Sequence, residues 1–218
     1  MDREKPIEVK VVDVREEQME ELRTRCAELE EECDMYKRMA FTDSLTGLGN
    51  RALLDGAVHA DRRHVQTGYC VVAFDLDGFK EEVNDKYGHP AGDDVLRTFA
   101  NVIEGTIRTD DTAARPGGDE FTVILKGTDA GGACTAVRNV NSRWDGVRRE
   151  RGSYFNHVGF SAGISYSHSD ELGVMLEKHI ARADKALYAA KNSGKGCIGV
   201  YHMDSEKDGE YHVDFLDL

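Results

Sequence analysis

The heptapeptide Arg115-Pro116-Gly117-Gly118-Asp119-Glu120-Phe121 decides how this chain folds and where its chemistry lies. Two adjacent glycines allow a tight turn, including positive φ angles, and the apolar run 121–125 that follows is typical of a strand. A hairpin here holds the carboxylates of Asp119 and Glu120 at the mouth of a sheet. Charges are rarely buried without a partner. Mg²⁺ is a natural partner, because it binds one or two carboxylates together with phosphate oxygens.

A second acidic segment follows a predicted strand earlier in the chain. Residues 69–76 contain a continuous apolar run, and the segment ends in Asp75-Leu76-Asp77. Asp75 is therefore expected at the carboxyl end of a buried strand, where α/β proteins bind ligands. If this strand pairs with the hairpin, three carboxylates converge on a site for one or two metal ions, which would polarise phosphoryl oxygens. The alternative is that Asp75 and Asp77 cap the next helix; the hairpin acids in the same chain favour the metal site.

The remaining periodicity predicts an α/β fold with a mixed central sheet flanked by helices. Strands are expected at 69–76, 112–115, 121–126, 158–167 and 197–201, and helices at 14–40, 51–64, 79–86, 92–108, 128–148 and 173–192. We expect three parts: a helical stalk at 1–40, a catalytic domain at 41–202 and an acidic tail at 203–218. Because the tail has few structural signals, its composition predicts disorder.

Residues 14–40 carry an apolar stripe whose members alternate at spacings of three and four, as in a coiled coil. The stripe consists of Met19, Leu22, Cys26, Leu29, Cys33, Tyr36 and Ala40. Two interpretations are open: a single amphipathic helix that lies on its own domain, or a short parallel coiled coil that makes a homodimer through residues 14–40. Cysteine, tyrosine and alanine stabilise a coiled-coil core less than leucine, isoleucine or valine do, so we expect the affinity of such a dimer to be low.

The net charge of −13 is concentrated at the two ends of the chain. Residues 13–34 carry a net charge of −7 and residues 203–218 a net charge of −5, so the middle of the chain is nearly neutral. The absence of a basic stripe argues against nucleic acid as a partner, and no apolar run approaches membrane length. Five scattered cysteines without a CxxC pair predict reduced thiols in the cytoplasm.

Five segments, in order, resemble motifs of the GGDEF-domain diguanylate cyclases over about residues 40–202. They are 43–51 (DSLTGLGNR), 75–80 (DLDGFK), 84–93 (NDKYGHPAGD), 117–121 (GGDEF) and 184–191 (DKALYAAK). The resemblance implies a palm-like nucleotide cyclase fold. It also implies that two GTP molecules, one per subunit, condense into cyclic di-GMP with release of two pyrophosphates, and that Mg²⁺ (or Mn²⁺) is the cofactor.

The resemblance further implies which residues hold the metal and the triphosphate. The metal would be held by Asp75, the Leu76 carbonyl, Asp119 and Glu120. Glu120 would join the metal site or assist deprotonation of the attacking 3′-hydroxyl. The triphosphate would meet Gly117, Gly118, Lys80, Lys191 and Lys195. The family usually has arginine where Lys195 stands; lysine keeps the charge but loses the planar fork.

Two further pairs of residues are implied by position. Asn84 and Asp93 would read the guanine edge, and Arg108 with Asp111 would form an inhibitory product site. The chain has three residues between Lys80 and Asn84, where the family has two. One extra residue turns a helix by about 100°, so either a helical bulge absorbs it or Asn84 points elsewhere.

Two alternatives to a cyclic di-GMP synthase stay open. One is a non-catalytic receptor for GTP or cyclic di-GMP that signals through the stalk; the intact acids Asp119 and Glu120 argue against it. The other is a related cyclase with an altered nucleotide preference, which the inserted residue motivates.

Overall fold

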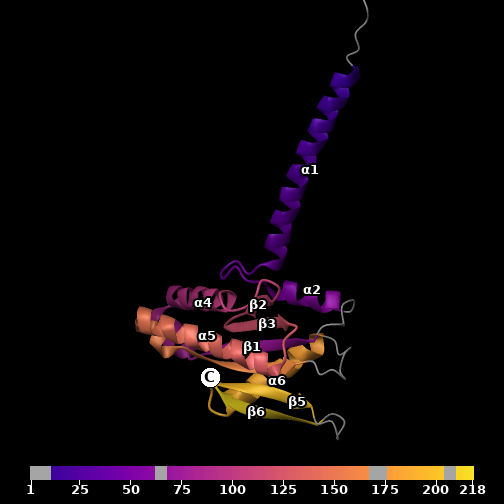
Figure 1. The fold of residues 1–218 in the computed structure, drawn as a ribbon. Helices are drawn as coiled ribbons and strands as arrows, with labels where there is room; N and C mark the ends of the chain where they lie inside the picture. Colours follow the sequence, from indigo (N-terminus) through magenta and orange to yellow (C-terminus); the bar gives the residue numbers. More distant parts are fainter. Residues whose placement is uncertain (1–10, 62–67, 167–175, 204–209) are drawn as a thin grey trace, which may run out of the picture. The chain divides into compact units, whose positions relative to one another are not determined.

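The computed structural model describes residues 11–61, 68–166, 176–203 and 210–218 (Figure 1). The elements are α1 (Val11–Phe41), α2 (Arg51–Asp61), β1 (Tyr69–Asp77), the π-helix η1 (Phe79–Asn84), α3 (Asp85–Tyr87), α4 (His89–Glu104), β2 (Thr112–Gly117), β3 (Glu120–Lys126), α5 (Ala130–Arg151), the 3₁₀-helix η2 (Ser153–His157), β4 (Gly159–Tyr166), α6 (Leu176–Asn192), β5 (Cys197–Met203) and β6 (Tyr211–Asp217). The chain divides into two compact units, 1–40 and 41–218.

The second unit is built on a six-stranded sheet in the order β2-β3-β1-β4-β5-β6. The β4–β5 pair is parallel, and the other pairs are antiparallel. The prediction of a mixed sheet flanked by helices is therefore confirmed. A short hairpin joins β2 to β3, and α6 provides the crossover that the parallel β4–β5 pair requires.

Side chains alternate along β1 between two helical layers, as the pleat of a strand requires. Val72 and Phe74 belong to the core beneath α4 and α5, where the Phe74 and Phe99 rings meet edge to face at 6.1 Å. Val71 and Ala73 belong to a smaller core beneath α2 and α6. The next residue in this second alternating set is Asp75, so the strand carries a carboxylate toward α6.

Two glycines let α6 approach the sheet closely. A Cβ on Gly163 of β4 would lie 2.1 Å from the Ala183 carbonyl oxygen, and one on Gly199 of β5 would lie 2.4 Å from the Ala186 carbonyl oxygen. Any side chain at these positions would push the helix away. The close contact holds the carboxyl end of α6, which carries Lys191, over the carboxyl end of β1.

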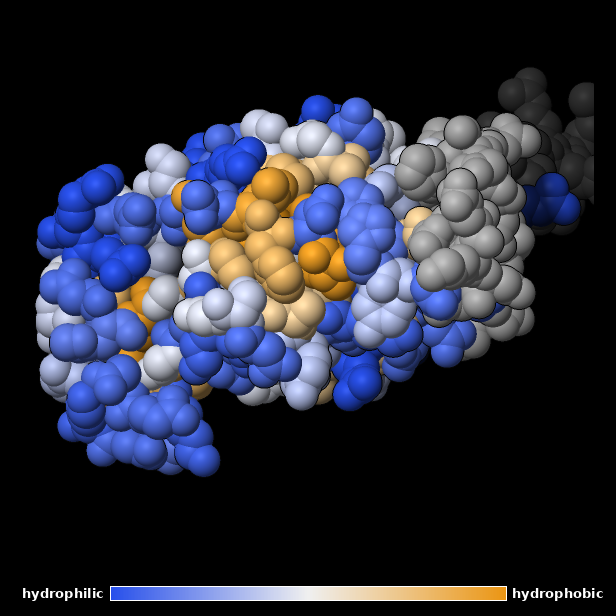
Figure 2. Space-filling model, turned by 90° about the horizontal axis from the view of Figure 1, so that it is seen from below, coloured by the Kyte–Doolittle hydropathy of each residue, from blue (hydrophilic) through white to orange (hydrophobic). Residues whose placement is uncertain are grey.

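The predicted disorder beyond residue 203 is wrong for residues 211–217. These form β6, which pairs with β5 from Cys197↔Asp217 to Met203↔Tyr211. Tyr211, Val213 and Phe215 alternate with polar residues in a largely exposed strand, and the acidic residues among them are typical of an edge strand. Figure 2 shows the molecule from the side on which β6 lies, where an apolar area is surrounded by polar side chains.

Several predicted segments extend past the described residues. The residues of these segments that lie outside them are 1–10 of the predicted stalk, 62–64 and 173–175 of predicted helices, 167 of a predicted strand and 204–209 of the predicted tail.

Helix α1 exposes the apolar stripe that the sequence predicts. Met19, Leu22 and Leu29 are 54%, 62% and 48% exposed. A helix of this length with an exposed apolar stripe fits a stalk; its pairing with a second chain stays a prediction. Within the described residues, no helix is both long enough and apolar enough to span a membrane.

Candidate active site

The hairpin and β1 bring the predicted acidic residues together. Asp75 lies directly opposite Glu120 in the antiparallel β1–β3 pair. The Leu76 N–H donates to the Asp119 carbonyl at 3.3 Å. Opposed residues of a sheet share a face and lie close enough to interact. The pairing that the sequence analysis required is therefore present, whereas the catalytic and metal-binding roles of these residues stay predictions.

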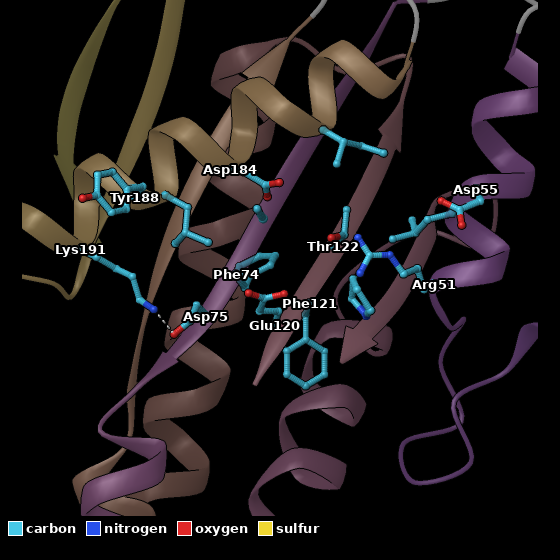
Figure 3. A pocket seen from close by; sticks show the side chains of 15 residues that line it. Arg51, Asp55, Phe74, Asp75, Glu120, Phe121, Thr122, Asp184, Tyr188 and Lys191 are labelled. Carbon is cyan, nitrogen blue, oxygen red and sulfur yellow. Dashed lines mark ion pairs between the residues drawn. The ribbon is translucent and has the colours of Figure 1, made fainter. Parts of the chain in front are cut away.

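Asp75 is the buried acid of this group. It is 7% exposed, and the Lys191 ammonium lies 2.6 Å from its Oδ1 (Figure 3). Burial raises the pKa of Asp75, and the negative charges of Asp119 and Asp77 raise it further, while Lys191 acts in the opposite direction. The site thus holds more negative charge than one lysine neutralises.

Asp77 anchors the turn that carries Lys195. Its Oδ2 accepts hydrogen bonds from the Ser161 hydroxyl at 2.8 Å and the Gly196 N–H at 3.1 Å. Its Oδ1 is buried without a hydrogen-bond partner among the described residues. The alternative that Asp75 and Asp77 cap the next helix is wrong, because η1 has no side-chain cap. The oxygen atoms of Asp75, Asp119 and Glu120, which the β1–β3 pair brings together next to Asp77, are of the kind that a hard divalent cation such as Mg²⁺ binds.

Arg115 ties the hairpin to the turn at 43–50. Its Nε donates to the Gly118 carbonyl at 2.9 Å, and its Nη1 lies 3.1 Å from both carboxylate oxygens of Asp43. Burial alone would raise the pKa of Asp43, but hydrogen bonds from Thr46 and Arg115 outweigh it and lower the pKa. Gly118 has φ 57°, a left-handed conformation that glycine adopts without strain. Asp43, which lies outside the hairpin, thus holds the Arg115 side chain that bonds to the turn.

The extra residue before Asn84 is accommodated in a π-helix. This is the helical bulge, the first of the two predicted outcomes. In η1, Phe79 and Val83 stay buried. The Asn84 side chain faces the first turn of α4: its Oδ1 lies 2.1 Å from where a Cβ on Gly92 would stand. Gly92 immediately precedes Asp93, so Asn84 lies against the turn of α4 that carries the second predicted base-reading residue, whose carboxylate is 3.7 Å from Arg97 Nη2.

The other predicted residues lie at the surface. The side chains of Lys80 and Lys195 are exposed. Arg108 and Asp111 line a cavity of about 370 Å³ next to the 43–50 turn. Asp111 already accepts backbone hydrogen bonds there, from the Arg108 N–H at 2.9 Å and the Lys126 N–H at 3.0 Å. Asp111 therefore stabilises the backbone of this turn through these two hydrogen bonds.

The groove between α2 and α6 is completed by residues that were not among the predicted site residues. This groove has a volume of about 370 Å³, and Figure 3 shows Asp184 of α6, Glu120 of β3 and Arg51 of α2 around it. Burial raises the pKa of Asp184, and Glu120 raises it further, while Arg51 lowers it. Asp184 lies seven residues, about two helical turns, before Lys191; this spacing could have placed it on the same face.

The mixed sheet with acids at the β1–β3 pair defines a palm-like nucleotide cyclase domain. Residues 40–197 match the family model described as "Diguanylate cyclase, GGDEF domain", and the chain belongs to the GGDEF family.

Named relatives of this family support the assignment. The chain is 36% identical over 165 residues to the diguanylate cyclase DgcS of Shewanella oneidensis. The match covers 72% of this chain and 52% of DgcS, so the chain spans about half the length of that relative. It is similar to the solved coiled coil and GGDEF domain of DgcB from Caulobacter crescentus in complex with c-di-GMP, with a TM-score of 0.72, 28% identity, and coverage of 85% of this chain and 98% of that one. It is also similar to the diguanylate cyclase SiaD from Pseudomonas aeruginosa, solved with its activator SiaC, with a TM-score of 0.67, 29% identity, and coverage of 85% and 72%.

Proposed function

We propose that this chain is a diguanylate cyclase that condenses two GTP molecules into cyclic di-GMP. The observation that carries the proposal is the β1–β3 register, which places Asp75 opposite Glu120 with Asp119 at the adjoining turn. Each 3′-oxygen forms a bond to the α-phosphorus of the other nucleotide, the bond to pyrophosphate breaks, and the hydroxyl proton is lost.

The acids provide the place for Mg²⁺ or Mn²⁺. Asp75, Asp119 and the Leu76 carbonyl would hold it, with Glu120 as a further ligand or as the group that accepts the hydroxyl proton. When bound, the ion polarises phosphoryl oxygens and stabilises the charge that develops on them.

Basic and glycine residues hold the triphosphate in this proposal. Lys191 exchanges its contact with Asp75 for a phosphate, while Lys195 and Lys80 add exposed positive charge. The open space beside Gly117 and Gly118, where a Cβ would meet nothing within 4 Å, leaves the backbone accessible to phosphate oxygens.

Guanine selection is assigned to Asn84 and Asp93. An amide and a carboxylate match the O6 acceptor and the N1–H and N2–H donors of guanine. Mixed GTP and ATP reactions test this assignment, because a cyclase of altered preference would incorporate adenine.

Two chains are needed, since each domain presents one nucleotide. We assign the pairing to the α1 stripe, and a solved relative is itself described as a coiled coil with a GGDEF domain. Leu22→Lys with Leu29→Lys should lower the specific activity more at low than at high protein concentration. Thr24→Lys with Glu31→Lys, off the stripe, is the matched control and should leave the concentration dependence unchanged. Turnover by the Leu22/Leu29 variant that does not depend on concentration would contradict the dimer.

Arg108 and Asp111 are assigned to a product-binding site that inhibits the enzyme. Their shared cavity next to the 43–50 turn supports this role. Arg108→Ala should relieve inhibition by added cyclic di-GMP.

The free thiols of the described cysteines and the use of GTP both favour a cytoplasmic location.

The decisive experiment is chromatography of the products that the full chain forms from GTP and Mg²⁺. The wild type should yield cyclic di-GMP and pyrophosphate, and Glu120→Gln should yield neither. Glu150→Gln, an exposed position on α5, is the matched control and should behave as the wild type does. Binding of GTP without pyrophosphate release by the wild type would favour the receptor instead.

A further inference from the structure

The outer hairpin of the sheet gathers two histidines and an aspartate away from the candidate active site. Ligand atoms of His202, His212 and Asp214 all lie within 4.8 Å of one another. His202 lies opposite His212 in the β5–β6 pair, and Asp214 is two residues further along β6. In a strand, residues two apart point to the same face, so the three side chains share one face of the hairpin.

The spacing of one pair of ligand atoms matches a metal site. His202 Nε2 and Asp214 Oδ2 are 3.2 Å apart. A tetrahedral zinc ion, with bonds of about 2.0–2.2 Å, separates neighbouring ligand atoms by about 3.3–3.5 Å. An ion can therefore bind between these two atoms with little movement. The His212 ring is exposed and stacks on His202 at 4.9 Å, so it can turn to supply the third ligand.

A neighbouring strand orients the first of these ligands. The Tyr166 hydroxyl on β4 lies 2.9 Å from His202 Nδ1. When the Tyr166 oxygen accepts a hydrogen bond from Nδ1–H, the lone pair of Nε2 is left for a metal, which is the usual arrangement around metal-bound histidine. Tyr166 thus fixes His202 with Nε2 facing Asp214.

We propose that His202, His212 and Asp214 form a transition-metal site of the zinc class, with Tyr166 as a positioning residue and a water molecule in the fourth position. Imidazole with carboxylate suits zinc and its neighbours in the first transition row, whereas Mg²⁺ prefers oxygen ligands alone. The site joins β6 to β5, so its occupation stabilises this edge of the sheet. This inference does not depend on cyclase activity.

The test is zinc binding by the full chain after chelator treatment, measured by competition with a chromophoric chelator. Two measures suppress zinc binding elsewhere on the chain. Excess Mg²⁺ occupies sites made of carboxylates, and the substitutions Cys26→Ser and Cys33→Ser remove the exposed thiols of α1. In that background, the His212→Ala variant should bind one zinc ion per chain fewer than the parent protein. His157→Ala, at an exposed histidine outside the cluster, is the matched control and should retain it.

A second variant keeps all three ligands. Tyr166→Phe should bind zinc about 10–100-fold more weakly, and zinc should raise the midpoint of thermal unfolding of the wild type but not of the His212 variant. Equal zinc stoichiometry and affinity in the parent and in His212→Ala would overturn the site. Unchanged affinity in Tyr166→Phe would overturn the role of Tyr166.

Discussion

Gly92→Ala tests whether the π-helix places Asn84 for base recognition. In the middle of a helix, alanine in place of glycine normally stabilises a protein by about 0.5–1 kcal/mol. At this position the new Cβ would lie 2.1 Å from Asn84 Oδ1 and 3.1 Å from Phe79 Cζ. The Asn84 side chain can rotate away, so the expected loss concerns recognition more than folding.

The size of the effect follows from the contacts that the displaced amide loses. Leaving polar partners of the base unpaired costs about 1–3 kcal/mol, or about 5–150-fold in kcat/KM for GTP. The preference for GTP over ATP should fall with it. Steady-state pyrophosphate release with each nucleotide measures both quantities, and urea unfolding measures the stability.

A second helical glycine provides the control for this prediction. A Cβ on Gly146 of α5 would meet nothing within 4 Å, so Gly146→Ala should show the full stabilisation of about 0.5–1 kcal/mol and unchanged kinetics. If Gly92→Ala instead matches Gly146→Ala in stability, KM and base preference, then Asn84 does not read the base from the observed position.

Three further predictions concern stability and reactivity. Trp144→Phe should lower the free energy of unfolding by at least about 1–3 kcal/mol, because the Val158 carbonyl loses the 2.9 Å hydrogen bond from the indole and stays buried; urea titration followed by circular dichroism measures this. Asp184→Asn should stabilise the protein slightly at neutral pH and have less effect below pH 3.8, the unfolded value, because a raised folded-state pKa means that stability is lost as pH rises through it. The gain is small because Asp184 is exposed and solvent screens its charge; unfolding at two pH values checks the sign. Cys70, whose pKa burial raises to about 12, should resist maleimide while the exposed Cys26 reacts, and peptide mapping would contradict this if both were labelled at the same rate.

Most of the sheet could be predicted because its strands carry strong local signals. The apolar run at 69–76 and the glycine pair before Asp119 determine two strands, and their carboxylates meet because antiparallel pairing is the simplest arrangement of a hairpin beside a buried strand. The strand β6 was missed because an edge strand needs fewer apolar residues and carries acids such as Asp214. Local composition cannot distinguish such a strand from an acidic tail.

The parts of the site that were missed depend on contacts distant in sequence. Arg115 bonds to Asp43 across 72 residues, and Asp77 bonds to Gly196 across 119. Neither contact has a periodic signature, since each follows from the packing of separate elements. The inserted residue before Asn84 shows the same limit: the sequence offers a bulge or a redirected side chain, and the packing of Val83 in the core selects the bulge.

The electrostatics of the site explain why it should need a cation beyond the lysine it holds. Asp75 is buried, and the neighbouring acids raise its pKa against the effect of Lys191. Removing that lysine to bind a phosphate would leave Asp75 buried with no positive partner among its described contacts, a state that costs several kcal/mol in proteins. A triphosphate brings more negative charge, so Lys191 can leave Asp75 only when another cation takes its place. Binding of the nucleotide and of a divalent ion should therefore be mutually dependent at this site.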